Sequence, residues 1–204
     1  MFTGIIESVG TVQSIHKEGK NFVFRILSEL TPELSIDQSV SHNGVCLTVE
    51  DIDIENNIYR VTAIDETLEK TNLGKLKDGQ KVNIERSVTL DKRMDGHMVQ
   101  GHVDEIVECT AVKDVEGSTL FTFLLNPHKR HLLVPQGSVT LDGVSLTVAR
   151  LNEMEFSVAI IPYTLDNTII HFWKQGTKVN IEYDIFGKYL ERYLEVYGKG
   201  WNSK

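Results

Sequence analysis

The chain has 204 residues, of which 41% are hydrophobic and 25% are charged, and its formal net charge is −8 at pH 7. With no Lys- or Arg-rich run, this acidic balance argues against a nucleic-acid partner, which requires a basic surface. No apolar run is long enough to span a bilayer and no signal pattern opens the chain, so we expect a cytoplasmic protein in which Cys46 and Cys109 stay reduced.

The sequence of the first half is repeated in the second half. Ser41–Val49 reads SHNGVCLTV, and Thr140–Val148 reads TLDGVSLTV 99 residues later (140 − 41). Because domains of about 100 residues are common, the repeat indicates two domains. The predicted divisions are residues 1–96, residues 97–187 and a tail of residues 188–204.

In the first half, strand-like segments alternate with turn signals. They are rich in β-branched and aromatic residues, as strands prefer. Thr31 before Pro32 predicts the start of a short helix, and Thr67 can cap another through its hydroxyl. The predicted strands are 1–7 continuing through 10–15, then 21–27, the two strands around the Asn-Gly turn, 58–64 and 79–85.

The second half follows the same order. Asn126 before Pro127 predicts a short helix, and Thr164 can cap another. The matching strands are 99–112, 119–125, the two around the Asp-Gly turn, 156–161 and 176–182. Because no long crossover helices are present, the strands must be antiparallel. The predicted fold is all-β, with two tandem six-stranded antiparallel barrels of Greek-key-like topology and a C-terminal α-helix.

The strand after each turn carries polar side chains on one face. Alternation along a strand places Cys46 and Thr48 together, and Ser145 and Thr147 in the same position of the second copy. One interpretation is that these groups only satisfy nearby backbone atoms. Their repetition favours the other, that they bind the polar groups of a ligand.

The tail differs from the barrels. Tyr189, Tyr193 and Tyr197 recur every fourth residue, beside Leu190 and Leu194, which predicts an amphipathic helix that ends near Gly198 and Gly200. Its apolar stripe can pack on the barrels or on the same helix of a neighbouring chain. We favour the neighbour, because isolated helices of this length are marginal in water.

Four motifs together resemble one family. MFTGIIE at the start, HNGVCLTV, GHMVQGHV and DGVSLTV occur in the order and spacing of riboflavin synthases of the alpha-chain type. The resemblance implies two lumazine-binding barrels and a homotrimer held by the C-terminal helices. It also implies conversion of two 6,7-dimethyl-8-ribityllumazine molecules into riboflavin and 5-amino-6-ribitylaminouracil, without a metal or a cofactor.

The resemblance also implies two substrate sites, one for each barrel. In each site, backbone N–H and C=O groups would bind the pyrimidine dione part of the lumazine ring. The first site would use Gly4, Ile5, Ile6, Ser39, Cys46, Leu47, Thr48, Thr62, Ala63, Ile64, Asp65, Glu66 and Thr67. The second would use Gly101, His102, Val103, Gln136, Ser145, Leu146, Thr147, Ala159, Ile160, Ile161, Pro162, Tyr163 and Thr164.

His102 is the natural candidate for proton transfer, because an unperturbed histidine titrates near neutrality. Water and the hydroxyl groups of the site remain alternatives for this role. The other interpretation is that His102 has only a structural role, as a hydrogen-bond partner of a strand. A nucleophilic role for Cys46 is not favoured, because the sequence shows no adjacent base. No metal site is expected at His97 and His102, which lack further ligands at a suitable spacing. The candidate catalytic set is His102, Ser145, Thr147, Cys46, Phe2 and Thr3.

Two residues depart from the family pattern, both in the second half. Gln136 replaces a lysine that is common before Gly-Ser, and Tyr163 replaces a polar or charged residue. The main alternative function is a non-catalytic lumazine or flavin carrier of the same fold, but such carriers have eroded motifs in one barrel. An oligonucleotide-binding barrel would need exposed aromatic residues among basic ones.

Overall fold

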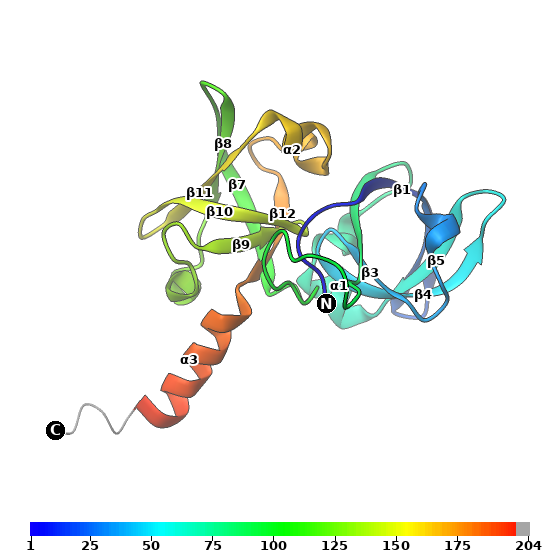
Figure 1. Cartoon of the computed structure of the whole chain (residues 1–204), viewed down its shortest axis with the longest axis horizontal. Coiled ribbons are helices and arrows are strands. Elements are labelled where there is room, and N and C mark those ends of the chain that lie inside the picture. The colour runs from blue at the N-terminus through cyan, green and yellow to red at the C-terminus, as the bar shows by residue number, and fades with distance from the viewer. Residues whose placement is uncertain (199–204) are drawn as a thin grey trace.

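In the computed structural model, which describes residues 1–198, the strands form two closed antiparallel barrels that lie side by side (Figure 1). The first is β1 (Ser8–Glu18), β2 (Asn21–Leu27), β3 (Ser39–His42), β4 (Val45–Asp53), β5 (Ile58–Ala63) and β6 (Lys81–Arg86). The second is β7 (Glu105–Val115), β8 (Ser118–Leu124), β9 (Ser138–Leu141), β10 (Val144–Leu151), β11 (Glu155–Ile160) and β12 (Lys178–Tyr183). In the first barrel the order is β1-β2-β5-β4-β3-β6, and the second follows the same connectivity. The predicted fold class is confirmed.

The segments at the start of each repeat are not strands, contrary to prediction. Residues 1–7 and 99–104 precede β1 and β7, and only Phe2 and Val99 form an isolated bridge. Gly4 and Gly101 have φ angles of +78° and +81°, which interrupt an extended strand. The first strand of each barrel therefore begins later than the sequence suggests.

The two predicted turns are confirmed as two-residue hairpin loops. Asn43 and Asp142 have φ angles of +48° and +44°, and each is followed by a glycine with positive φ. These are the backbone angles of a type I′ turn.

Short helices lie where the sequence predicts them, but three of the four predicted caps are wrong. The short helices are the 3₁₀ segments η1 (Thr31–Glu33), η2 (Asn72–Lys75), η3 (Pro127–Leu132) and η4 (Ile169–Phe172), and the α-helices α1 (Asp65–Lys70) and α2 (Pro162–Asp166). Thr67 and Thr164 lie inside α1 and α2 and do not cap them. Thr71 and Thr168, four residues later, cap η2 and η4 by accepting from Leu73 N and Ile170 N. Thr31 also lies within its helix, whereas Asn126 caps η3 as predicted.

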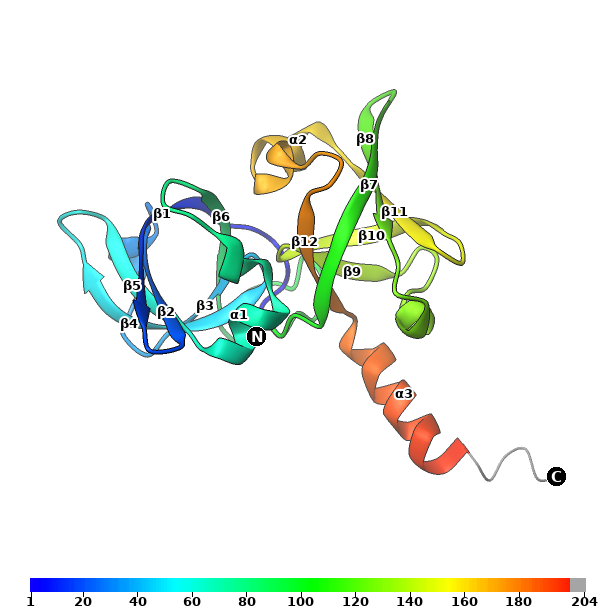
Figure 2. The ribbon, with the colours of Figure 1, turned by 180° about the vertical axis from the view of Figure 1, so that it is seen from behind.

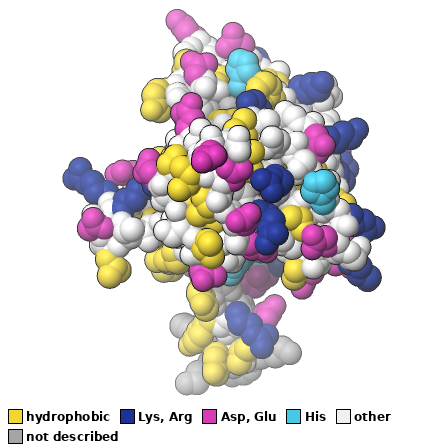
Figure 3. Space-filling view, turned by 90° about the vertical axis from the view of Figure 1, so that its right-hand side faces the viewer, with side chains coloured by type: hydrophobic (Ala, Val, Ile, Leu, Met, Phe, Trp, Pro, Cys, Tyr) yellow, Lys and Arg dark blue, Asp and Glu magenta, His cyan; other side chains and the backbone are white. Residues whose placement is uncertain are grey.

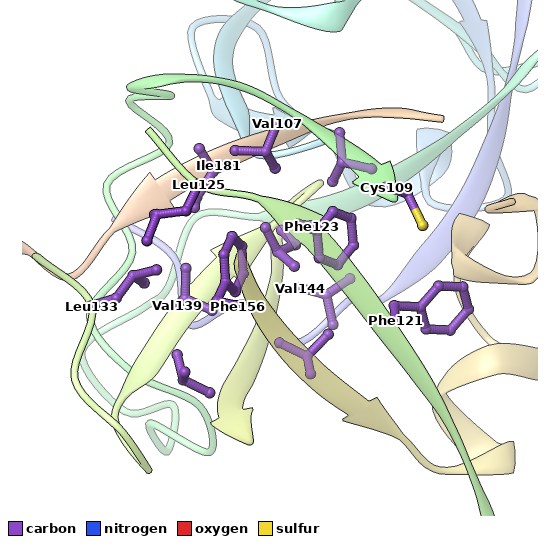
Figure 4. Packing of buried hydrophobic residues seen from close by; sticks show 14 of the residues in the cluster. Val107, Cys109, Phe121, Phe123, Leu125, Leu133, Val139, Val144, Phe156 and Ile181 are labelled. Atoms are coloured by element: carbon purple, nitrogen blue, oxygen red, sulfur yellow. The ribbon is translucent and has the colours of Figure 1, made fainter. Parts of the chain in front are cut away.

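Each barrel encloses its own core of buried side chains. In the second barrel, Phe123 and Phe156 stack with ring centroids 5.4 Å apart (Figure 4). Phe123 also meets Trp173 edge to face, with ring centroids 5.6 Å apart. Aromatic pairs of this kind add about 0.5–1.5 kcal/mol beyond area burial. The cores also include residues outside the strands, such as Leu73 in η2 and Ile170 in η4.

The two repeated turns face each other between the barrels. Figure 2 shows from behind where the two barrels meet. A Cβ atom on Gly44 would lie 2.8 Å from Gly143 N, so only glycine allows this approach. Asp142 is 1% exposed and accepts hydrogen bonds from Asn180 N, Asn72 Nδ2 and Trp173 Nε1. Burial raises the pKa of Asp142 to about 7, although these hydrogen bonds act in the opposite direction.

This carboxyl group makes the stability of the fold depend on pH. A folded-state pKa above the unfolded value means that the folded chain binds more protons between about pH 4 and pH 7. As the pH rises from about 4 to about 7, the contribution of Asp142 to the free energy of unfolding therefore falls by roughly 2–4 kcal/mol. Denaturant unfolding from pH 4 to pH 8 measures how the free energy of unfolding changes with pH. Asp142→Asn should remove this fall in stability, whereas Asp51→Asn, at an exposed position, should keep it. An unchanged slope in Asp142→Asn would assign the dependence to other groups.

The helix α3 (Ile185–Tyr197) projects away from both barrels (Figure 1). It starts three residues before the predicted Lys188, because Asp184 caps it by accepting from Phe186 N at 2.9 Å. Gly187 lies inside the helix, and the predicted stop at Gly200 falls outside the described residues. Within residues 1–198, no helix is long and apolar enough to cross a membrane.

Candidate functional site

A buried carboxylate on the last strand of the first barrel holds the start of the chain. Glu85 on β6 accepts hydrogen bonds from Thr3 N at 2.7 Å, Thr3 Oγ1 at 2.8 Å and Gly4 N at 2.9 Å. Burial raises the pKa of Glu85, while these hydrogen bonds lower it. We call Phe2–Gly4 the first crossing segment, because it leads from this barrel to the other.

The first crossing segment contacts the repeated motif of the second barrel. Ser145 N donates to Gly4 O at 2.8 Å. A Cβ atom on Gly4 would lie 2.6 Å from Ser145 Cβ, so the two backbones approach as closely as a glycine permits.

The second repeat contains the equivalent arrangement. Glu182 on β12 accepts from Gln100 N at 2.7 Å and from Gly101 N and His102 N at 2.9 Å each. Burial raises the pKa of Glu182 as well, against the hydrogen bonds to Gln100, His102 and Gly101 and the charge of Lys188. Gln100–His102, the second crossing segment, contacts the first barrel, where Cys46 N donates to Gly101 O at 2.9 Å.

These contacts correct the predicted pairing of the motifs within one chain. The sequence suggested that Gly4 lies with Cys46 and that Gly101 lies with Ser145. The structure pairs Gly4 with Ser145 and Gly101 with Cys46. Each ligand motif is thus completed by a segment that the other barrel holds.

The predicted pairing placed His102 beside Ser145. In the structure the histidine bonded to Ser145 is His97. His97 Nδ1 lies 2.7 Å from Ser145 Oγ, and His97 Nε2 lies 3.2 Å from Thr140 Oγ1. Burial lowers the pKa of His97 and so favours the neutral ring, although the charge of Asp184 acts in the opposite direction. A neutral imidazole bonded to a hydroxyl can accept or relay its proton. The side chain of His102 is exposed.

A cavity of about 760 Å³ opens beside the Gly4–Ser145 contact. Its wall combines residues predicted for both sites: Gly4, Ile5, Ile6, Ser145, Tyr163 and Thr164. A volume of this size suits a bicyclic ring with a polyol chain. We call the Gly4–Ser145 and Gly101–Cys46 contacts the two ligand walls. The described chain therefore holds a ligand-sized cavity at the first of them.

The other predicted residues are spread over both barrels. Thr62 Oγ1 donates to Glu50 and Ala63 is buried, whereas Asp65 pairs with Lys20 at 3.1 Å. The strand predicted over residues 58–64 is β5 and ends at Ala63, because α1 begins at Asp65. The remaining predicted residues lie on strands or next to short helices. On strands are Ser39 (β3), Leu47 and Thr48 (β4), Leu146 and Thr147 (β10), and Ala159 and Ile160 (β11). Glu66 and Thr67 lie in α1 and Pro162 in α2, whereas Ile64, Ile161 and Val103 come just before α1, α2 and β7.

Two candidate catalytic residues face inward. Phe2 is 0% exposed and packs against Gly101, and the hydroxyl of Thr3 donates to Glu85. Their observed contacts hold the crossing segment in place. Of the two departures from the family pattern, Tyr163 lines the cavity and Gln136, with φ +66°, is exposed in the turn before β9.

Sequence reasoning missed Glu85, Glu182 and the role of His97. A signal for the two carboxylates was present, because Val-Asn-Ile-Glu occurs at 82–85 and again at 179–182. A charged residue that follows three buried strand residues in both repeats indicates a required buried contact. For His97 we find no comparable signal in the sequence.

Comparison with known proteins identifies the family. A model described as "Lumazine binding domain" matches residues 3–87 and 100–184. Riboflavin synthase of Bacillus subtilis (strain 168) is 39% identical over 195 residues, covering 95% of this chain and 90% of that protein. The riboflavin synthase of Schizosaccharomyces pombe (strain 972 / ATCC 24843) is 36% identical over 207 residues, covering 100% and 99%.

Solved structures agree on the fold. LumP complexed with riboflavin matches with a TM-score of 0.82 at 18% identity, covering 90% of this chain and 100% of that chain. LumP complexed with 6,7-dimethyl-8-(1'-D-ribityl) lumazine matches with a TM-score of 0.80. Full-length matches above 30% identity and two matched domains lead to one conclusion: the chain belongs to the riboflavin synthase family of enzymes and is built from two lumazine-binding domains.

Proposed function

We propose that this protein converts two molecules of 6,7-dimethyl-8-ribityllumazine into riboflavin and 5-amino-6-ribitylaminouracil in the cytoplasm. A four-carbon unit passes from one lumazine to the other. The two products together contain all the atoms of the two substrates, so the reaction consumes no external oxidant or reductant.

The observation that carries the proposal is the doubled ligand wall. Gly4 with Ser145 and Gly101 with Cys46 are equivalent contacts, one on each barrel. A reaction between two identical molecules needs two similar sites, and holding both reactants can lower the barrier by roughly 7–11 kcal/mol. The C7 methyl group of the lumazine is acidic through its conjugated ring, so a modest base suffices.

Two histidines suit different steps of this reaction. His97 is bonded to Ser145 at the wall of the cavity and can take a proton through that hydroxyl. His102 is the last residue of the second crossing segment and presents its ring to solvent, where a second chain can approach. The Thr and Asp or Glu side chains of residues 65–67 are suited to the ribityl hydroxyls.

The direct test is to incubate the purified protein with the lumazine alone. We expect the fluorescence of riboflavin to appear, with one riboflavin formed for every two lumazines consumed. Tight binding of the lumazine without any riboflavin would reject the enzyme and favour a carrier. The fold shared with LumP is the observation in favour of that second candidate, but both motifs are intact here.

The proposal includes a homotrimer held by α3. Tyr189, Leu190, Tyr193, Leu194 and Tyr197 are between 52% and 69% exposed. Figure 3 shows hydrophobic side chains on this helix, at the bottom of the view. An apolar stripe of this extent needs a partner, and in the described chain the barrels do not cover it.

Removing residues 188–204 is expected to give monomers whose barrels remain folded, because no α3 side chain belongs to either core. Turnover should fall strongly if the two sites that react belong to different chains. Sedimentation velocity and far-UV circular dichroism measure the two effects. A control is Arg192→Ala, which changes the same helix outside the stripe and should leave the trimer intact. A trimer that survives the deletion would contradict the assignment of α3 as the contact.

A further inference from the structure

Glu85 and Glu182 are buried carboxylates, and among residues 1–198 their hydrogen bonds all come from their crossing segments. Glu85 is 1% exposed and Glu182 is 3% exposed. Each accepts three hydrogen bonds, and every donor belongs to the segment that precedes its own barrel. Hydrogen bonds to an ionised acceptor are stronger than neutral ones, so each carboxylate fixes its segment firmly.

The segments carry this hold across to the opposite barrel. Glu182, on β12, holds Gly101, whose carbonyl accepts from Cys46 N on β4. Glu85, on β6, holds Gly4, whose carbonyl accepts from Ser145 N on β10. Each carboxylate is therefore one hydrogen-bonded residue away from the ligand motif of the other barrel.

We propose that Glu85 and Glu182 are positioning residues that act crosswise. Glu182 of the second barrel sets the ligand wall at Cys46 in the first barrel, and Glu85 of the first barrel sets the wall at Ser145 in the second. Their effect on turnover rests on the proposed function, whereas their effect on the walls does not.

Isosteric substitution removes the hold without changing the size of the side chain. In Glu182→Gln an amide N–H₂ replaces one oxygen and meets a backbone N–H that it cannot accept. The second crossing segment then opens more often, and Cys46 beneath Gly101 is uncovered. Glu85→Gln should loosen Thr3 and Gly4, which Glu85 holds. Phe2 packs against Gly101, but Glu182 still holds Gly101 and His102, so Cys46 should stay covered.

The thiol of Cys46 reports this directly. Cys46 is half-buried and Cys109 is 0% exposed, so a chromogenic disulfide reagent applied to the folded full-length protein distinguishes them. We expect Glu182→Gln to raise the rate of Cys46 modification roughly tenfold, as for loss of about 1.4 kcal/mol of hold, and Glu85→Gln to change it less than about twofold. Val179→Ala, which removes core methyl groups from the same strand β12, is the control for general loosening.

The outcomes separate the proposal from its alternatives. If Glu85→Gln exposes Cys46 and Glu182→Gln does not, or if Val179→Ala acts as strongly as Glu182→Gln at equal thermal stability, the crosswise role is wrong. If Cys109 reacts as fast as Cys46, the variant is unfolded, and Glu182→Asp, which keeps the charge but withdraws it by one carbon, takes its place under the same criteria. Because the assay needs no substrate, it gives its answer even if the protein makes no riboflavin.

In the active protein the same variants should raise KM for the lumazine more than Val179→Ala does. In a chain with Cys46→Ser and Ser145→Cys, the pattern should invert, so that Glu85→Gln exposes the new thiol. Loss of this inversion would mean that the two walls are not held in equivalent ways.

Discussion

Gly4→Ala is expected to lower turnover by about 10²-fold or more while the barrels stay folded. The new Cβ atom would lie 2.6 Å from Ser145 Cβ and 2.7 Å from Ser145 N, which forces the first crossing segment away from the wall. A displacement of about 1 Å at a reacting site costs on the order of 10²-fold in rate. Steady-state kinetics with the lumazine measures the loss.

Gly117→Ala is the matched control. Gly117 has a φ angle of +81°, close to the +78° of Gly4, but its Cβ atom would meet nothing within 4 Å. Both substitutions strain the backbone by about 1–2 kcal/mol, and only Gly4→Ala adds the steric conflict with Ser145. Equal losses of turnover in the two variants would show that strain alone, and not the crossing contact, is responsible.

His102→Gln is expected to lower turnover by ~10²–10⁴-fold, the contribution of a group that transfers a proton, while the affinity for ligand stays within a few-fold. The backbone N–H that His102 donates to Glu182 is retained, so the segment keeps its place. Rates at saturating lumazine and riboflavin binding by fluorescence titration separate the two effects.

His97→Gln and His16→Gln complete the comparison. His97 is bonded to Ser145 inside the chain, and His16 is exposed on β1, far from either motif in sequence. If His97→Gln abolishes turnover and His102→Gln only weakens binding, the proton passes through Ser145 and His97. His16→Gln should leave the rate unchanged in either case.

The sequence predicts most of the fold because the fold is encoded locally and twice. The turns at 43–44 and 142–143 follow from Asn-Gly and Asp-Gly, and the strands follow from apolar residues that recur in the same order. The amphipathic stripe predicts α3, with an error at its start because Asp184 was not recognised as the cap. These features depend on neighbours along the chain.

The crossing contacts could not be predicted in the same way. MFTGIIE has the composition of a strand, and nothing in its pattern says that Gly4 pairs with a residue 141 positions away (145 − 4). Resemblance assigned the segment to the motif of its own half, since sequence similarity shows which positions match and not which copies meet. The two carboxylates were passed over for a related reason: their partners are backbone N–H groups, which every sequence contains.

The crossing segments bear on how such a chain arose. Each segment precedes one barrel, is held by that barrel's own carboxylate and yet completes the other barrel, which is the arrangement of a symmetric dimer whose subunits exchange their N-terminal arms. Joining two such subunits end to end gives a single chain in which the exchange persists as an internal contact. A gene fusion of this kind would need no new contact between the barrels, because the exchanged segments would already connect them.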